Sequence, residues 1–240
     1  MKHPYRIYIT TCDKYIYALR PMAWLMNKYW PNTPPVEIIG FTPPPFDLPP
    51  RWTFHSMGRQ EEYPFNKWTN AVIEFVESQP DQVFCLMLED MWPIRHVDTE
   101  AIQYLVDYMH QFEYVARIDL TGDRLYAGGM RNYGYVNRID LIWSNPASQY
   151  HCSLMAGIWR KRALLDVFRR DWSPHDVELQ GSPLLSRMSE WLVLGTRQWP
   201  LRHTLAFRSQ NASKLLLDEI DGEDIKEMRA LGYFDPWEAR

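Results

Sequence analysis

The sequence predicts an α/β protein with a Rossmann-type central sheet, mixed or mostly parallel, that is flanked by helices. Two observations lead to this class. Short β-rich runs alternate along the chain with amphipathic segments of helical period, and one run, residues 82–88 (QVFCLML), is nearly all apolar. A continuously apolar run is typical of a strand buried on both faces of a parallel sheet. The length of 240 residues fits a single domain of this kind.

The first half of the chain is expected to alternate strands and helices. β-Branched and aromatic residues mark the strands, and apolar side chains at helical spacing mark the helices. A proline-rich loop, TPPPFDLPP, ends the second strand. The predicted elements, in order, are strand 6–10, helix 16–29, strand 36–41, strand 53–57, helix 67–78 and strand 82–88.

The second half continues the alternation and contains a glycine-punctuated stretch that predicts a loop or hairpin. Its predicted elements are helix 99–112, strand 113–120, loop or hairpin 122–140, strand 150–158, helix 161–169 and loop 173–182. Asp221 and Asp224 mark the start of a terminal helix that Gly232 closes. We interpret residues 1–120 as a nucleotide-binding half, 121–215 as an acceptor and catalytic half, and 216–240 as a C-terminal helix.

Composition excludes several classes of protein. The formal net charge is −4 and no long Lys or Arg run occurs, so the broad basic field needed for non-specific nucleic-acid binding is missing. No apolar stretch is long enough for a membrane span, and no signal-peptide pattern opens the chain, so we expect a cytoplasmic protein. Cys12, Cys85 and Cys152 show no spacing typical of zinc sites or disulfide frameworks.

Several catalytic motifs are absent. The turn after the first strand reads TTCDKY, without the glycine loop of dinucleotide-binding folds, and no P-loop motif occurs. The seven histidines lack zinc-binding spacing, and no nucleophile elbow for a serine hydrolase is present. Among the histidines, only His151 is a candidate metal ligand, as a third ligand beside two carboxylates. A bound nucleotide must therefore have its phosphates neutralised by a metal ion or by basic side chains.

Two acidic residues, Glu89 and Asp90, directly follow the apolar strand. Ligands of open α/β sheets bind beyond the carboxyl ends of the strands, so this pair and the polar residues after the first strand should face one site. Mg²⁺ and Mn²⁺ are commonly held by one or two carboxylates together with substrate phosphates. The alternative is that one acid caps the following helix or pairs with Arg95.

A second acidic group lies in SPHDVELQGS, which contains Asp176 and Glu178. A carboxylate in a cleft is able to remove a proton from an acceptor hydroxyl. The alternative is that these acids cap a following helix. The chain is also rich in aromatic residues, with 11 Trp. Trp159, Trp172 and Tyr133 are candidates for stacking on a sugar or an acceptor, although core packing is the more ordinary role for such residues.

Taken in order, the segments RIYITTCDKY, VEIIGF, LMLEDMW, YHCSLMAGIWRKRALL and SPHDVELQGS resemble GT-A-type glycosyltransferases, in particular small bacterial and phage enzymes related to polysaccharide synthesis. The resemblance spans residues 6–182, and GEDIKEMRALGY is similar to the terminal helix of that family. It implies a GT-A-like fold and transfer from a nucleotide-sugar donor, such as a UDP-sugar, with Mn²⁺ or Mg²⁺.

The resemblance also implies roles for particular residues. Thr10, Thr11 and Asp13 are expected against the nucleoside, and Glu89 and Asp90 replace the D-x-D motif, with Asp90 as the direct metal ligand. The motif differs from D-x-D, because its first acid is Glu and Met91 or Trp92 stands at the usual third position. Basic side chains that could neutralise the diphosphate instead are Lys14, Arg117 and Arg160. Asp176 or Glu178 corresponds to the catalytic base of inverting enzymes.

The acceptor stays open at this stage. A growing polysaccharide is one candidate, and a hydroxymethylated base of phage DNA is another, because four arginines surround one loop: Arg117, Arg124, Arg131 and Arg138. Two other functions remain as alternatives, a nucleotidyltransferase and a non-catalytic protein of the same fold that binds a sugar or a nucleotide.

Overall fold

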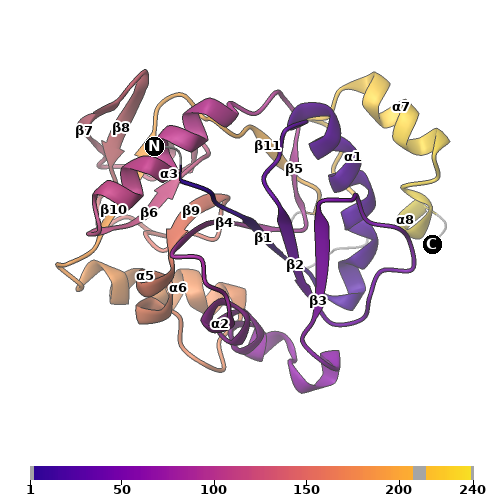
Figure 1. The fold of residues 1–240 in the computed structure, drawn as a ribbon, viewed down its shortest axis with the longest axis horizontal. Coiled ribbons are helices and arrows are strands. Elements are labelled where there is room, and N and C mark those ends of the chain that lie inside the picture. The colour runs from indigo at the N-terminus through magenta and orange to yellow at the C-terminus, as the bar shows by residue number, and fades with distance from the viewer. Residues whose placement is uncertain (1–2, 208–214, 239–240) are drawn as a thin grey trace.

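The computed structural model describes residues 3–207 and 215–238, and they form an α/β fold around a mixed, mostly parallel sheet (Figure 1). This confirms the predicted fold class. The main sheet has nine strands in the described part of the chain, in the order β3-β2-β1-β4-β9-β6-β10-β8-β7, and a small second sheet pairs β11 with β5. Five of the strands come from the predicted first half and the others from the second, so one sheet connects both halves.

The strands begin and end close to the predicted positions in the first half of the chain. Their bounds are β1 Ile7–Thr10, β2 Val36–Gly40, β3 Trp52–Ser56, β4 Val83–Leu88, β5 Met91–Pro93, β6 Val115–Asp119, β7 Arg131–Val136, β8 Ile139–Trp143, β9 Gly157–Arg160, β10 Leu192–Thr196 and β11 His203–Leu205. The hairpin predicted within 122–140 is present as β7 and β8, after the short helix α4.

The helices cover both faces of the sheet. Their bounds are α1 Leu19–Tyr29, α2 Trp68–Ser78, α3 Thr99–Gln111, α4 Asp123–Tyr126, α5 Lys161–Val167, α6 Pro174–Ser186, α7 Gly222–Ala230 and α8 Asp235–Glu238. Three short 3₁₀ turns, η1 Asp13–Ala18, η2 Gln60–Glu62 and η3 Phe65–Lys67, precede α1 or α2. In Figure 1, α2, α5 and α6 lie together on one side of the sheet and α1 and α3 on the other.

Two hydrophobic cores result from this layering. Alternating residues of each strand point to opposite faces of the sheet, so Ile7 and Ile9 of β1 pack with α1 and α3, whereas Tyr8 packs with α2 and α5. The C-terminal helices join the first of these cores, in which Met228 and Phe234 are fully buried. Most of the sheet is therefore covered on both faces, as the apolar run of β4 predicts.

Parallel pairing brings the carboxyl ends of β1 and β4 side by side. Thr10 pairs with Leu88 of β4 and with Ile39 of β2. Because parallel strands end at the same edge, the residues that follow them, Thr11 and Glu89, leave the sheet as neighbours. This carboxyl edge carries the predicted donor site.

Strand β9 runs antiparallel between β4 and β6. The predicted strand over 150–158 is wrong, because only its last two residues are in β9 and residues 150–156 form a loop. The loop is held by polar bonds that replace strand pairing, such as the one from Cys152 N to Ser182 Oγ (3.0 Å). Since β9 starts where β4 and β6 end, this loop lies at the carboxyl edge.

The predicted loop over 173–182 is also wrong, because these residues form the first part of α6. Ser173 and Asp176 make a capping box: Ser173 Oγ accepts from the Asp176 amide (3.1 Å), and the Asp176 carboxylate accepts from the Ser173 amide (2.9 Å). Pro174 occupies the first helical position, where its missing N–H costs nothing. The helix-cap alternative is therefore the correct one for Asp176.

The terminal helix is confirmed as α7, and α8 follows it. Asp221 caps α7 by accepting from the Glu223 amide (3.0 Å). Gly232 follows the helix with a φ of +68°, a conformation that favours glycine. Residues 208–214 of the predicted acceptor half and residues 239–240 of the predicted terminal helix lie outside the described residues.

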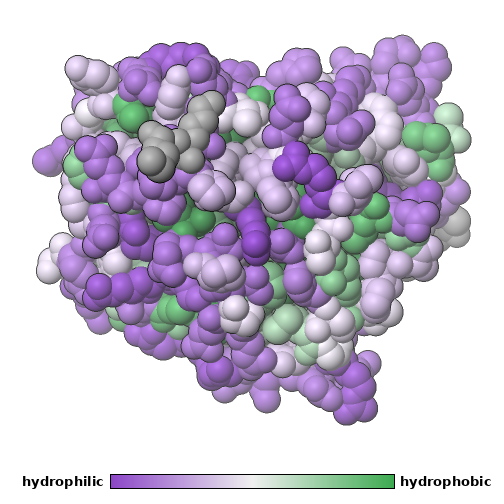
Figure 2. Space-filling model, viewed as in Figure 1, coloured by the Kyte–Doolittle hydropathy of each residue, from purple (hydrophilic) through white to green (hydrophobic). Residues whose placement is uncertain are grey.

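No helix among the described residues has the length and apolarity required to cross a membrane. The face in Figure 2 is mostly hydrophilic, with hydrophobic residues in small separated patches.

Thr69 at the start of α2 fixes the turn that precedes α6. Its side chain is fully buried, donates to the Arg169 carbonyl (2.7 Å) and accepts from the Trp172 amide (3.0 Å). We expect Thr69→Val to lower the free energy of unfolding by about 1–2 kcal/mol, because it leaves two partly buried backbone groups without this partner. Urea unfolding measures the loss. Thr53→Val, at an exposed position of β3, is the control and should stay within about 0.5 kcal/mol of the parent.

Candidate functional site

Glu89 and Asp90 form a tight turn between β4 and β5 at the carboxyl edge. The turn is held through its backbone. The Glu89 amide donates to the Thr10 carbonyl (3.2 Å), the Trp92 indole donates to the Glu89 carbonyl (3.0 Å), and the Ala206 amide donates to the Asp90 carbonyl (2.7 Å). Strands β1, β5 and β11 thus fix the backbone, and both carboxylates are left free for another role.

Both side chains are partly buried. Burial, together with the neighbouring Asp90 charge, raises the pKa of Glu89 well above its usual value, and burial raises the pKa of Asp90 to about 6. Asp90 Oδ1 is buried without a hydrogen-bond partner in the protein. A carboxylate pair with an unpartnered oxygen fits a hard divalent cation, which would remove the repulsion and supply the missing partner.

The predicted donor residues at the end of β1 and in the turn after it make different contacts. Thr10 and Thr11 are buried, and Thr10 Oγ1 has no partner in the protein. Asp13 accepts from the Thr42 amide and hydroxyl (both 2.9 Å), and so ties the loop after β1 to the loop after β2. Lys14 is exposed, with its ammonium 5.1 Å from the Tyr15 ring centroid, and lines a cavity of about 440 Å³ with Arg20 and α8.

A buried ion pair stands at the carboxyl end of β6. Arg117 Nη2 donates to Asp119 Oδ2 (2.8 Å) and to the Met155 carbonyl (2.7 Å), while Asp119 Oδ1 accepts from the Thr121 amide (2.7 Å) and hydroxyl (2.6 Å). Although burial alone would raise it, the pKa of Asp119 is lowered, because Arg117 and Arg124 lie beside it and Thr121 donates to it. Arg117 therefore supports the loop before β9 from inside the fold.

His151 belongs to this cluster. Its Nδ1 lies 3.0 Å from Ser144 Oγ, which Arg124 also contacts (3.4 Å). Burial, and then the charges of Arg124 and Arg117, lower the pKa of His151 to about 4, so the ring is neutral. Two arginines beside it oppose the binding of a cation, and no group of three or more His, Cys, Asp or Glu side chains suited to a metal occurs within residues 3–207 and 215–238. His151 as a metal ligand is therefore not supported.

Glu178 reaches the same edge from the second turn of α6. Its Oε1 accepts from the Leu154 amide (2.9 Å), which places the carboxylate on the loop before β9. Burial raises the pKa of Glu178, and the nearby Asp123 adds to this. Asp176 is committed to the capping box instead, and the bonds from Ser173 lower its pKa. Glu178 is thus the stronger of the two predicted bases.

Arg160 and Trp159 lie away from the predicted donor site. Arg160 pairs with Val83 at the opposite end of β4 from Glu89, and its guanidinium donates to the Val115 (3.0 Å) and Phe112 (3.1 Å) carbonyls. It ties β9 to β6 and has no access to a diphosphate at the carboxyl edge. Trp159 is fully buried and packs in the core, and Trp172 packs against the same core.

The four arginines considered for binding modified DNA do not form an exposed cluster. Arg117 and Arg124 are buried and paired with acids, and Arg138 is paired with Asp98 (2.8 Å) and Glu100 (2.7 Å). Of these four arginines, Arg131 alone is exposed and makes no salt bridge with an acidic side chain of the described residues. The four arginines are near one another in sequence, but the side chains of Arg117 and Arg124 point into the fold and the side chain of Arg138 is neutralised, which sequence spacing does not reveal.

Sequence reasoning did not single out Asp119 and Thr121. Yet residues 117–121 (RIDLT) repeat the pattern of an apolar strand that ends in an acid. The rule that found Glu89 and Asp90 could have found Asp119 as well. Its partner Arg117 was expected at the donor diphosphate only through the resemblance to GT-A enzymes, and burial in an ion pair is an uncommon environment for an arginine.

The fold and the acidic edge define a class: an α/β protein with a polar site beyond the carboxyl ends of its strands. No protein-family model matches the chain, and no curated protein matches it. Solved structures do. A CMP:2-keto-3-deoxy-manno-octonic acid synthetase complexed with CTP is 9% identical, with 97% of this chain and 100% of that chain covered and a TM-score of 0.44.

Two further structures are similar. TarS of S. aureus is 9% identical over 80% of this chain and 58% of that chain, with a TM-score of 0.46. The galactosyltransferase LgtC, in complex with donor and acceptor sugar analogues, is 12% identical over 67% of this chain and 59% of that chain, with a TM-score of 0.34. Similarities of this strength do not carry an activity over to this chain.

The raised pKa of Asp90 predicts a pH-dependent stability. Its folded value of about 6 lies above its usual 3.8, so the stability that this group contributes is present at low pH and lost as pH rises through 6. We expect Asp90→Asn to be about 2 kcal/mol more stable than the parent near neutral pH, with a difference that shrinks under acid.

Urea unfolding at a series of pH values, with a chelator present, measures this difference. Asp47→Asn, at an exposed position of the proline-rich loop, is the control and should change little. A pH-independent gain in Asp90→Asn would contradict the burial of a charged carboxylate.

Proposed function

We propose that the chain is a glycosyltransferase that transfers a sugar from a nucleotide-sugar donor to a hydroxyl acceptor. The observation that carries this proposal is the partly buried carboxylate pair, Glu89 and Asp90, whose backbone is fixed and whose Asp90 Oδ1 is unpartnered. Residues 1–120 then supply the donor site and residues 121–215 the acceptor side. The resemblance of the sequence to GT-A enzymes supports this division.

The donor is proposed to lie along the carboxyl edge of β1 and β4. The loop after β1, braced by Asp13 and Thr42, faces the nucleoside, with Thr10 and Thr11 below it. Glu89 and Asp90 would hold Mn²⁺ or Mg²⁺ together with diphosphate oxygens, since two protein carboxylates suffice when a substrate supplies the remaining ligands. When bound, the cation would neutralise charge on the leaving diphosphate. Lys14, which is exposed and directly follows Asp13, is a basic side chain that could also help to neutralise the diphosphate.

Glu178 is proposed as the general base. It accepts the proton of the acceptor hydroxyl while the hydroxyl oxygen forms a bond to the anomeric carbon, and the bond from that carbon to the diphosphate breaks. The nucleoside diphosphate leaves with the bonding electrons. Because the hydroxyl attacks from the face opposite to the leaving diphosphate, the configuration at the anomeric carbon inverts. The Leu154 amide holds one carboxylate oxygen, and the raised pKa brings Glu178 closer to the range in which a base works well.

Glu178→Gln is expected to reduce transfer by at least about 100-fold, because the amide keeps the bond to Leu154 but has no basic oxygen. Release of nucleoside diphosphate and formation of glycosylated product, measured over a donor panel, give the rate. Asp176→Asn decides between the two predicted bases: it should retain turnover and lose about 1 kcal/mol of stability through the capping box. Loss of activity in Asp176→Asn alone would reverse the assignment.

Ligand-dependent melting tests the donor site without turnover. A nucleoside diphosphate with Mn²⁺, at saturating concentration, should raise the Tm of the parent by about 5 °C. The Mn²⁺-dependent part of this shift should disappear when Glu89→Gln and Asp90→Asn are combined, and Asp47→Asn should retain it. An equal Mn²⁺ shift in the double variant would remove these carboxylates from the metal site.

The same assays separate the alternatives. Release of pyrophosphate from a nucleoside triphosphate would identify a nucleotidyltransferase, which the sequence also allowed. Nucleotide-dependent melting without any turnover across the donor panel would favour a binding protein of this fold.

A further inference from the structure

Two adjoining cavities lie along helix α6 and lead from Glu178 away from the carboxyl edge. The first, of about 440 Å³, lies between α6 and residues 146–150 and includes Glu178 among its lining residues. The second, of about 740 Å³, lies between the C-terminal end of α6 and the β7–β8 hairpin. Pro146 and Ser186 line both cavities and are hydrogen-bonded to each other. The two cavities therefore adjoin at this contact. We call them together the α6 groove, and Glu178 lines one end of it.

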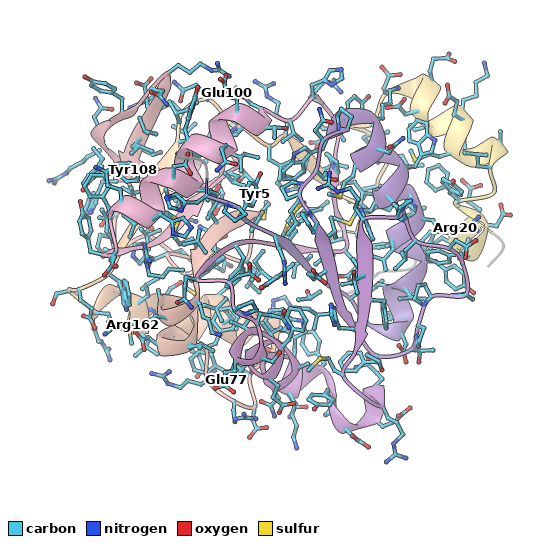
Figure 3. The ribbon with its side chains drawn as sticks, viewed as in Figure 1. Tyr5, Arg20, Glu77, Glu100, Tyr108 and Arg162 are labelled. Atoms are coloured by element: carbon cyan, nitrogen blue, oxygen red, sulfur yellow. The ribbon has the colours of Figure 1, made fainter. Side chains whose placement is uncertain are left out.

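Aromatic rings line the far end of the α6 groove. They are Tyr114, Tyr133, Trp143 and Trp191. Tyr114 and Tyr133 are 45% and 40% exposed, although their hydroxyls are 3.2 Å apart. Figure 3 shows Tyr108 of α3 and Arg162 of α5 on the same side of the molecule. Tyr108 lies close to the tyrosine pair, and Arg162 lies over the Trp191 ring.

The rings are held in place by polar neighbours. The Trp191 indole donates to Asp166 (3.1 Å), and the Arg162 guanidinium lies 5.5 Å from its ring centroid. Arg131 lies 5.6 Å from the ring centroid of Trp143. Fixed aromatic faces beside hydroxyl and carboxylate groups, here Ser186, Ser189 and Glu190, are suited to rings that have an apolar face and a polar rim.

The charge of the α6 groove opposes a nucleic acid as its occupant. Its lining includes one arginine, Arg187, and two carboxylates, Glu178 and Glu190, while His151 is neutral. Of the two arginines beside the rings, Arg162 is paired with Asp166 (3.8 Å), and Arg131 adds one positive charge. A phosphate backbone requires Lys and Arg along its path. An uncharged chain of sugar rings has no such requirement, and each cavity has room for a small ligand.

We propose that the α6 groove binds an uncharged oligosaccharide, with its acceptor end at Glu178 and preceding sugar units on the aromatic end at Tyr114, Tyr133, Trp143 and Trp191. This inference rests on the proposed glycosyltransferase function for the orientation of the chain, but not for the binding itself. It selects the carbohydrate acceptor over the DNA base, and it implies that affinity grows with the number of sugar units.

Binding without a donor tests the groove directly. The full chain is titrated calorimetrically with glucose, galactose and N-acetylglucosamine oligosaccharides, from disaccharides to hexasaccharides. We expect the longer members of at least one series to bind more tightly than the disaccharide. Tyr133→Ala should weaken that binding by roughly two- to tenfold, because it removes one stacking face. Tyr133→Phe should retain it, since the ring remains.

Tyr135→Ala is the matched control, because Tyr135 lies two residues further along β7, is 77% exposed and is outside the groove lining. It should bind as the parent does. The proposal is overturned if no oligosaccharide of these series binds, if Tyr133→Ala binds as tightly as the parent, or if duplex DNA displaces the oligosaccharide. Donor hydrolysis is measured in the same variants. Its absence in the parent, with oligosaccharide binding intact, would count against the proposed function and leave the groove standing.

Discussion

The buried pair of Arg117 and Asp119 is the constraint on which the carboxyl edge depends. One guanidinium nitrogen binds both the Asp119 carboxylate and the Met155 carbonyl, so the end of β6 and the loop before β9 are fixed together. A side chain at Gly157 would place its Cβ 2.9–3.1 Å from this guanidinium, so only glycine leaves enough room. A buried ion pair adds little net stability because desolvation offsets its attraction, and its value here lies in the geometry that it imposes.

That geometry explains how residues distant in sequence reach one site. The antiparallel strand β9 separates β4 from β6 and starts at the edge where both of them end. The loop before β9 therefore crosses the carboxyl edge, and its Leu154 amide binds Glu178 of α6. Thr69 of α2 fixes the turn before α6 through its bonds to Arg169 and Trp172. A shift of the loop before β9 would therefore move Glu178, the proposed base, while Glu89 and Asp90 stayed in place.

The sequence predicted the parallel part of the fold well and the antiparallel part poorly. Strands β1, β2 and β4 are mostly apolar runs whose positions along the chain follow from local pattern alone. Residues 150–158 contain buried polar side chains, His151 and Ser153, in place of a continuous apolar run. Tertiary contacts, which the local pattern does not reveal, bury these side chains in a loop. Helix α6 entered the sequence reasoning only as the alternative to a catalytic loop, although its capping box is readable as S-x-x-D. The placements of Arg117 and Arg160 depended on side-chain direction, which is set by the neighbouring strands.

The unpartnered polar atoms of the structure argue that this edge is built for a ligand. Folded proteins satisfy nearly all buried polar groups. Among the described residues, the buried side-chain atoms without a partner include Asp90 Oδ1 and Thr10 Oγ1 near the ends of β4 and β1, Thr196 Oγ1 at the end of β10, and nitrogens of Arg117 and Arg124. The others belong to Tyr5, Trp30, His110 and Trp159, away from this edge. Such atoms weaken the fold, as the raised pKa of Asp90 also does. Apolar side chains would stabilise the same turns better, so a polar, charged ligand at this edge is the simplest reason for a protein to keep them.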